Sequence, residues 1–278
     1  MYDFRKSAYL VNYFLSAALT AITLVLNSSL FLKLWARRQG DAHLKTIYLS
    51  IFWHVAFALV TCVHSTYMIL YFTGSSSRVD WLIFISGDLV YSTEVSIGIC
   101  NIINAFDRVM AMWQPIRYYQ SYQIAIQRMA VLFTVMTTSS FVIAFYTTRH
   151  ETMPTVVFAF ASYINLDVLF SLHWFDCATS IINILVSIVF LRELHKFVTQ
   201  MKTNMVIRPA GSAKVDQLIK YQIIADFIIL IAPILTTSTA KYGWHADWPS
   251  QIGPYPITLF TLYTAVCALL FKYKLRVN

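Results

Sequence analysis

Charged side chains are scarce in this sequence. Asp, Glu, Lys and Arg make up 12% of its 278 residues, about half the share found in soluble domains. A soluble fold of this length needs more polar surface than these residues provide. Hydrophobic residues account for 58% and aromatic residues for 16%, and Trp and Tyr are enriched where membrane helices meet the interface. The composition therefore excludes an ordinary soluble domain and predicts an integral protein of the lipid bilayer.

Catalytic motifs and cysteines outside the apolar stretches are also missing. The sequence contains no His-Glu-x-x-His, Gly-x-x-x-x-Gly-Lys-Ser/Thr or Gly-x-Ser-x-Gly motif, the signatures of zinc peptidases, phosphate-binding loops and serine hydrolases. We therefore expect no enzyme activity, no cofactor and no metal site. Free Cys within apolar segments behaves as a small hydrophobic residue. The four cysteines are Cys62, Cys100, Cys177 and Cys267.

Apolar stretches long enough to cross a membrane dominate the chain. A helix needs about 20 apolar residues to span a bilayer, and continuous apolar runs argue against the strict alternation of barrel strands. Seven such stretches occur, at residues 9–34, 47–73, 82–112, 129–147, 165–191, 221–240 and 254–271. The connections between them are too short to hold a soluble domain. The sequence therefore predicts an all-α membrane protein, a single seven-transmembrane helix bundle over residues 1–278.

The distribution of Lys and Arg predicts the orientation of this bundle. Of the 21 basic residues, five precede the first stretch or follow the second, fourth and sixth, and the other sixteen lie on the opposite side. The five are Arg5, Lys6, Arg78, Arg149 and Lys241. Cytoplasmic connections carry the excess of Lys and Arg, so we expect the N-terminus outside and the C-terminus in the cytoplasm. The net charge of +8 then follows from topology, and no nucleic-acid partner is predicted.

The two ends of the chain carry further expectations. The first apolar stretch is longer than the core of a cleavable signal peptide and lacks a small-residue cleavage pattern, so it is expected to act as the insertion signal itself. The segment FKYKLRVN after the last stretch contains no Ser, Thr or Cys, which are acceptors for phosphorylation and palmitoylation. Any arrestin-type shut-off is therefore expected to depend on residues in the inner loops. These are Ser121, Thr199, Thr203 and Ser212.

The most specific motif ends the third stretch. The segment NAFDRVMAMWQPIRYY, residues 104–119, fits the pattern D-R-x-x-A-x-x-x-P-x-x-Y. The matching positions are Asp107, Arg108, Ala111, Pro115 and Tyr118. This pattern, on the third of seven stretches and at the expected inner edge, resembles the end of the third helix in rhodopsin-like G-protein-coupled receptors.

The resemblance implies a role for each matching residue. Arg108 would turn inward and receive the C-terminal helix of a Gα subunit when the sixth helix swings out. Asp107 would hold Arg108 in place in the resting state. Pro115 and Tyr118 would shape the following inner loop, which G proteins also touch. A charge that changes partner is a two-state element that a ligand can bias.

Other features of that large family are missing. The second stretch has no Asp, the fourth has no Trp, and the seventh has no Asn-Pro-x-x-Tyr. The usual disulfide at the outer end of the third helix cannot form, because GSSSRVDWLIF and TRHETMPTVVFAFASY contain no Cys. With these departures, DRVMAMWQPIRYY and IGPYPITLFTLYTAVCALLF are most similar to the Srbc-like group of nematode serpentine chemoreceptors. That resemblance implies a plasma-membrane receptor, located for example in a sensory cilium, that binds a small molecule or pheromone and activates a heterotrimeric G protein.

Polar residues inside the third stretch are candidates for a ligand pocket. Intramembrane acids are costly and usually functional, and here they are Asp88 and Glu94. Tyr91 and Glu94 share a helix face, so we predict that they contact the ligand. In amine receptors the ligand-pairing Asp precedes the Arg by eighteen residues, a position held here by Val90, so an amine pocket of that design is not indicated. The alternative is that Glu94 is protonated or partnered between helices.

The fifth and sixth stretches carry the remaining candidates. His173 and Asp176 share a helix face, and a structural hydrogen bond between them is favoured over a ligand contact. Asp226 is expected to pair with a polar group of the third stretch, such as Asn101 or Asn104, and to hold the resting state. A lone satisfied carboxyl is the alternative. Pro233 is expected to kink the sixth helix as a hinge.

Two other classes of function remain open. One is a ligand-gated channel of the insect chemoreceptor type, which has seven helices but an N-terminus inside the cell. Such chains are longer, and the Lys and Arg distribution argues against the inverted topology. The other is a small transporter, which is expected to show paired repeats with broken helices. Only the stretch around Pro233 fits that description.

Overall fold

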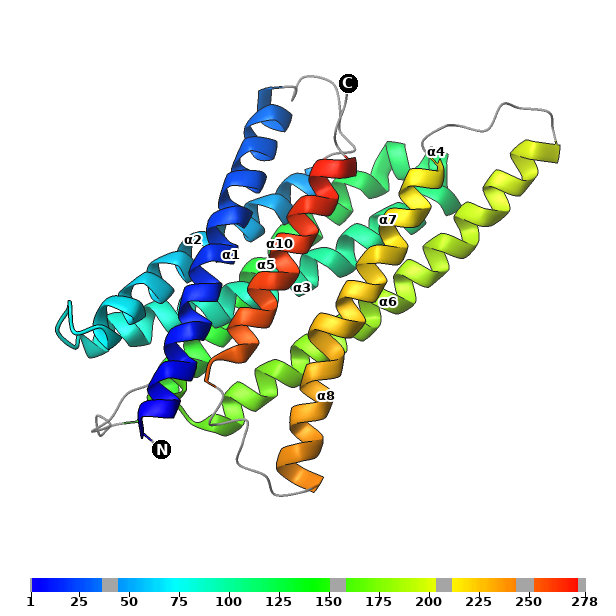
Figure 1. Cartoon of the computed structure of the whole chain (residues 1–278). Coiled ribbons are helices and arrows are strands. Elements are labelled where there is room, and N and C mark those ends of the chain that lie inside the picture. Colours follow the sequence, from blue (N-terminus) through cyan, green and yellow to red (C-terminus); the bar gives the residue numbers. More distant parts are fainter. Residues whose placement is uncertain (1, 37–44, 151–158, 204–211, 244–252, 275–278) are drawn as a thin grey trace.

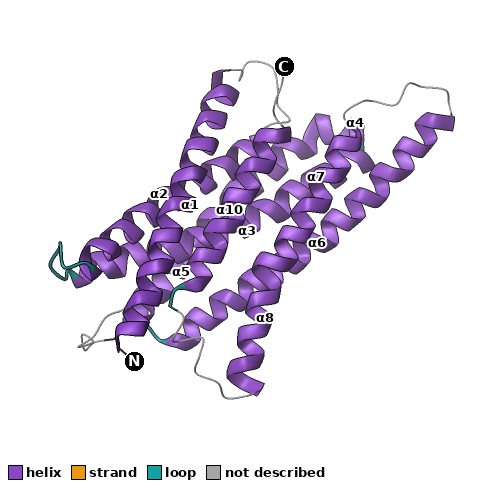
Figure 2. Cartoon of the chain, in the orientation of Figure 1, coloured by secondary structure: helices purple, strands orange, loops and turns teal. Residues whose placement is uncertain are grey.

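The computed structural model describes residues 2–36, 45–150, 159–203, 212–243 and 253–274. Almost all of that part is helical (Figures 1 and 2). It contains seven helical spans long and apolar enough to cross a membrane. The first three spans are α1 (Tyr2–Ala36), α2 (Lys45–Phe72) and α3 (Asp80–Trp113). The fourth span consists of α4 (Pro115–Arg117), η2 (Tyr118–Tyr122) and α5 (Gln123–Thr147). The fifth span is α6 (Leu166–Thr203). The sixth consists of α7 (Ser212–Ala225), η4 (Asp226–Ile231), α8 (Ala232–Ser238) and η5 (Thr239–Gly243), and the seventh is α10 (Tyr255–Lys274).

The seven-helix prediction is confirmed, and two boundaries differ from it. The fourth span begins at Pro115 rather than near residue 129, and α6 continues past residue 191 to Thr203. Both extensions carry polar side chains, which hide a helix from a search for apolar runs but suit a helix that leaves the hydrocarbon. The extension of α6 includes the ion pair between Lys196 Nζ and Glu193 Oε1, 2.7 Å apart and one turn apart on the helix. Within the described residues the strand-like pairing is limited to an isolated bridge between Arg149 and Ile164.

Helix α3 is the centre of the bundle. In its most apolar window 72% of residues are buried, against 17–50% in the other six spans. It packs against α2, α5 and α6, while α1 packs against α2 and α10. Gly98 allows α6 to come close, because a Cβ there would lie 2.8 Å from Thr179 Oγ1. Helix α3 therefore packs against three of the other six spans, and candidate site residues on α3 are well placed to connect them.

The sixth span is irregular around Pro233. Proline lacks a backbone N–H, and its ring collides with the carbonyl four residues earlier in a regular α-helix. The π-helix η4 comes directly before α8, and the Ala232 N–H bonds to Phe227 O instead of the usual partner. A π segment of this kind widens the helix and lets it change direction. Figure 1 shows the resulting bend between α7 and α8.

Candidate functional site

A cavity of about 310 Å³ lies between α1, α3, α6, the sixth span and α10. Tyr91, Glu94, His173, Asp176 and Pro233, all singled out from the sequence, line it together. The remaining predicted ligand residue, Asp88, is buried but lies outside the lining. Its carboxylate accepts a hydrogen bond of 2.9 Å from Ser92 Oγ on the same helix. The structure therefore gathers four of the five predicted ligand residues around one cavity.

Two carboxyl groups dominate the chemistry of this cavity. Glu94 on α3 is 3% exposed and Asp176 on α6 is 5% exposed. Oε2 of Glu94 and Oδ2 of Asp176 are buried without a hydrogen-bond partner among the described residues. No Lys or Arg of the described chain lines the cavity. Two acids thus line one cavity whose described residues supply no Lys or Arg as a counter-charge.

The other lining residues are mainly apolar or aromatic. Among them are Tyr9, Phe170, Trp174, Tyr255 and Phe260. The ring of His173 packs edge-on against Tyr91, with ring centroids 6.1 Å apart. The favoured hydrogen bond between His173 and Asp176 is not formed, because Asp176 Oδ2 has no partner and His173 instead contacts the rings of Tyr91 and Phe170. Sharing a helix face is not sufficient for a hydrogen bond when aromatic neighbours hold the imidazole.

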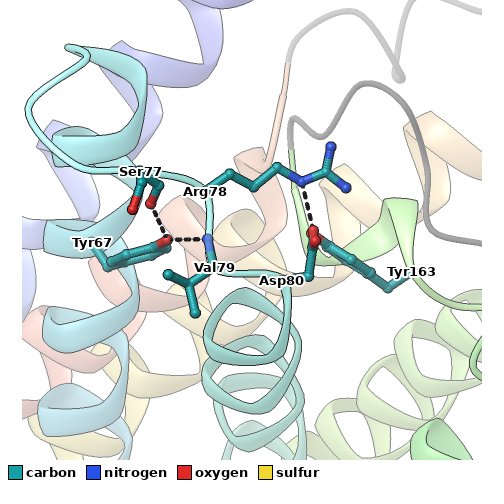
Figure 3. Close-up of polar contacts among 6 residues, drawn as sticks. All are labelled: Tyr67, Ser77, Arg78, Val79, Asp80 and Tyr163. Carbon is teal, nitrogen blue, oxygen red and sulfur yellow. Dashed lines mark hydrogen bonds and ion pairs between the residues drawn. The ribbon is translucent and has the colours of Figure 1, made fainter.

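A group of polar contacts, called the clamp here, lies at the end of α3 that carries Asp80 and consists of Arg78, Asp80 and Tyr163 (Figure 3). Arg78 Nε lies 2.6 Å from Asp80 Oδ1, and the Tyr163 hydroxyl donates a hydrogen bond to the same carboxylate oxygen. Burial and this hydrogen bond raise the pKa of Tyr163, so the phenol stays a neutral donor. Tyr67 of α2 fixes the neighbouring turn, because its hydroxyl donates to Ser77 O at 3.0 Å and accepts from the Val79 N–H at 2.7 Å.

The clamp ties the segment before α6 to the start of α3 without a covalent bond. Tyr163 belongs to that segment and Asp80 is the first residue of α3. The Arg149 guanidinium adds a second tie, lying 4.7 Å from the centroid of the Phe84 ring. These contacts join the two regions that a disulfide joins in the receptors that the sequence resembles. The start of α3 is thus held to the segment before α6 by noncovalent contacts, the Arg78–Asp80–Tyr163 group among them.

Phe160, in the short 3-10 helix η3 (Phe160–Ser162), packs beside the cavity against α3 and α5. Its ring packs against Tyr91 and Phe145, with centroids 5.4 Å and 5.3 Å away, and its neighbour Ala159 lines the cavity. This packing requires a glycine at position 87, because a Cβ there would lie 2.5 Å from Phe160 Cβ. Gly87 thus fixes how closely the loop approaches α3.

We expect Gly87→Ala to destabilise the protein by about 1–3 kcal/mol, the usual cost of overpacking a tight contact. Alanine is the better helix former by about 1 kcal/mol, so the collision with Phe160 has to exceed that gain. The melting temperature of the purified protein measures the net effect. Gly243→Ala is the matched control, because a Cβ at Gly243 would meet nothing closer than Thr239 at 3.7 Å. An equal or higher melting temperature for Gly87→Ala than for the control would contradict this packing.

A buried hydrogen-bond network lies deeper in the bundle, below the cavity. Asn101 Nδ2 on α3 donates to the Tyr263 hydroxyl on α10 at 2.8 Å, and Tyr263 in turn bonds to the Asp226 carboxyl. Asn183 Nδ2 on α6 donates to Asp226 Oδ2 at 2.6 Å. Asp226 therefore reaches α3 through Tyr263, and Asn104 is buried outside this network. The network joins four spans, and the Asp226 carboxyl at the start of η4 contacts α6 and α10 directly.

The sequence did not point to Tyr263 or Asn183 as partners of Asp226. Both lie in strongly apolar helices. Tyr263 is 37 residues from Asp226 in the sequence and Asn183 is 43 residues from it. A buried Asn among Ile and Leu, in the phrase SIINILV, was the available signal. Buried amides are nearly always hydrogen-bonded, so such a residue predicts a partner without identifying it.

At the opposite end of the bundle the Asp107 carboxylate is held by neutral donors. Tyr118 Oη donates to Asp107 Oδ1 at 2.7 Å and Thr46 Oγ1 donates to Asp107 Oδ2 at 3.1 Å. The described residues form no ion pair between Asp107 and Arg108, and Arg108 is partly exposed. The opposite charges of Asp107 and Arg108 still attract each other without a direct ion pair, and the restraint of Arg108 by Asp107 stays a prediction. Asp107 links α2, α3 and η2.

The segment after Arg108 is helical rather than an extended loop. Gln114 alone interrupts the helix, with φ −138° and ψ 64°, because a residue before proline avoids the α-helical region. Pro115 then begins the fourth span, where its missing N–H costs nothing. This tight connection brings Tyr118 back under α3, 2% exposed, where it reaches Asp107.

An apolar cluster closes the Arg108 end between three spans. Its buried members are Val109 of α3, Phe190 of α6 and Ile219 of α7. Val109 follows Arg108 directly, so α7 packs beside the predicted G-protein contact.

Comparison with known proteins agrees with the seven-helix fold and the motif on α3. No curated protein matches the chain. The family model of the serpentine type 7TM GPCR chemoreceptor Srbc matches residues 6–204, which include the cavity residues of α3 and α6 and the segment from Asp107 to Tyr118. The chain therefore belongs to the Srbc family of serpentine seven-transmembrane chemoreceptors.

Proposed function

We propose that this protein binds a small extracellular ligand in the cavity around Glu94 and Asp176 and activates a heterotrimeric G protein at the Arg108 end. One observation carries the proposal: the sixth span takes part in all three structural elements that such a receptor needs. Pro233 lines the cavity, Asp226 holds the buried network, and Ile219 closes the apolar cluster beside Arg108. A ligand that moves α8 therefore acts on the other end of the same span.

The proposed activation follows that span inward. An agonist shifts α8 through Pro233 and its neighbours Ile229 and Leu230, which also line the cavity. The widened turn of η4 absorbs the movement, because π segments bend more readily than regular helix. Asp226 then leaves Asn183, Ile219 separates from Val109, and the Gα helix reaches Arg108. The ligand supplies only the difference in its affinity for the two states.

The orientation that we propose places the Asp80 end outside and the Arg108 end in the cytoplasm of a plasma membrane, for example that of a sensory cilium. The Lys and Arg distribution supports it. An epitope tag at the N-terminus is expected to be stained on intact cells, and a C-terminal tag only after permeabilisation. Staining of the C-terminal tag on intact cells would contradict this orientation, and an internal N-terminus would favour the insect-type channel.

The function is tested by a ligand screen in cells that express the receptor with a promiscuous Gα subunit. An active compound is expected to trigger a response that requires both proteins. Cells with the receptor but without the Gα subunit are the control. A response that persists in those cells as a ligand-gated current would contradict G-protein coupling.

A further inference from the structure

The cavity holds two acidic side chains, and no basic residue of its described lining neutralises them. Burying a carboxylate without a partner is strongly unfavourable, yet Glu94 and Asp176 both have an unpartnered buried oxygen in one cavity. Asp88, the neighbouring buried acid on α3, is stabilised in the ordinary way, because the Ser92 hydroxyl donates a hydrogen bond to it. The two cavity acids therefore need hydrogen-bond donors that a molecule bound in the cavity would supply.

The lining residues indicate the chemical class of the molecule that binds in the cavity. The described lining contains no Lys or Arg, and its one imidazole, His173, packs against aromatic rings instead of either acid. Among the described residues no group of three or more His, Cys, Asp or Glu side chains is arranged to hold a metal ion. The remaining wall is aromatic and aliphatic, with Phe170, Trp174 and Tyr255 among its members. An organic cation suits this wall better than an inorganic one.

We propose that the cavity selects small protonated amines, with the ammonium group at Glu94 and Asp176 and an apolar body against the aromatic wall. An ammonium carries three N–H donors and no acceptor, so one group satisfies both unpartnered oxygens. Aromatic rings attract organic cations as well as apolar bodies. The site differs from the amine pocket of other receptors, because Val90 occupies the usual position and lies outside the lining. The ammonium is placed one turn deeper, at Glu94.

This inference rests on the proposed function only in treating the cavity as the ligand site, and its test needs no G protein. The melting temperature of the purified receptor in lipid nanodiscs is measured with 2-phenylethylamine and with straight-chain amines of increasing length. Each amine is paired with its alcohol, and 3-phenylpropanoate serves as the anionic analogue. A ligand that binds only the folded state raises the melting temperature. Amines are expected to raise it, and their alcohols and the anion are expected to have little effect.

Three variants test whether the amine-induced rise in melting temperature depends on the two acids. Glu94→Gln and Asp176→Asn keep the shape of the side chain and remove its charge, so each is expected to weaken the amine by about tenfold or more. Without ligand, both variants are expected to melt at the same or a higher temperature than the wild type, because a strained buried charge is gone. Asp88→Asn is the matched control and is expected to leave the amine shift unchanged.

Several results would overturn the inference. These are equal shifts from amines and alcohols, no amine shift anywhere in the series, or stabilisation by sodium chloride that amines do not exceed. The wild-type comparison of amine with alcohol stands even if a variant fails to fold. Amine binding without nucleotide exchange would count against the proposed coupling and leave this inference standing. Exchange driven only by neutral ligands would support the coupling and overturn this inference.

Discussion

Arg108→Ala is expected to abolish agonist-driven nucleotide exchange while ligand binding and surface expression stay close to wild type. The residue lies at the end of α3 opposite the cavity, so its loss leaves the ligand contacts intact. Removing one charged partner from a buried contact costs on the order of 3 kcal/mol, or about a hundredfold in affinity for the partner.

The measurement is agonist-dependent GTP-analogue binding in membranes that contain matched amounts of receptor. Arg128→Ala is the control, since Arg128 is an exposed arginine of α5, in the same half of the chain and outside the motif. We expect the control to keep most of the exchange rate. Wild-type exchange in Arg108→Ala would refute the assignment of this residue to the G protein.

Asp226→Ala is expected to raise exchange in the absence of ligand by about tenfold. The change removes the acceptor of Asn183 and Tyr263 and leaves two buried donors unsatisfied, at a cost of about 1–3 kcal/mol to the resting state. If the network is specific to that state, the balance shifts toward the active one by the corresponding factor. Basal exchange, corrected for receptor amount, measures the shift.

Asn104→Ala is the matched control for the network, because Asn104 is a buried amide of α3 that takes no part in it. It is expected to leave basal exchange near the wild-type rate. An unchanged or reduced basal rate in Asp226→Ala, at normal surface expression, would show that the network persists in the active state.

Hydropathy predicted the fold well because the bilayer imposes helix length directly. All seven spans were found from apolar runs, and the errors fell where helices leave the hydrocarbon. The fourth span starts at Pro115 and α6 ends at Thr203, both within segments too polar to register as apolar. The four residues of the shut-off prediction lie in helical elements rather than in a loop: Ser121 in η2, Thr199 and Thr203 in α6, and Ser212 at the start of α7. Their role in shut-off stays a prediction.

The sequence predicted candidate residues on individual helices, but not the contacts between helices. Tyr91 and Glu94, three residues apart, do line one cavity. Contacts across the bundle were not predictable, since the spacing within one helix says nothing of the facing helix. Thr46 as a partner of Asp107 and Tyr263 as a partner of Asp226 are examples. A single sequence indicates which buried polar side chains need a hydrogen-bond partner. Which residue becomes the partner depends on how the helices pack.

The most direct test of the proposed receptor is nucleotide exchange with purified components. The protein in lipid nanodiscs is mixed with a purified heterotrimeric G protein, and binding of a non-hydrolysable GTP analogue is followed with and without an active ligand. The account predicts that the ligand accelerates exchange in the wild type and fails to do so in Arg108→Ala. No acceleration by a ligand that binds the cavity, together with a ligand-gated current through the protein in a planar bilayer without G protein, would contradict it.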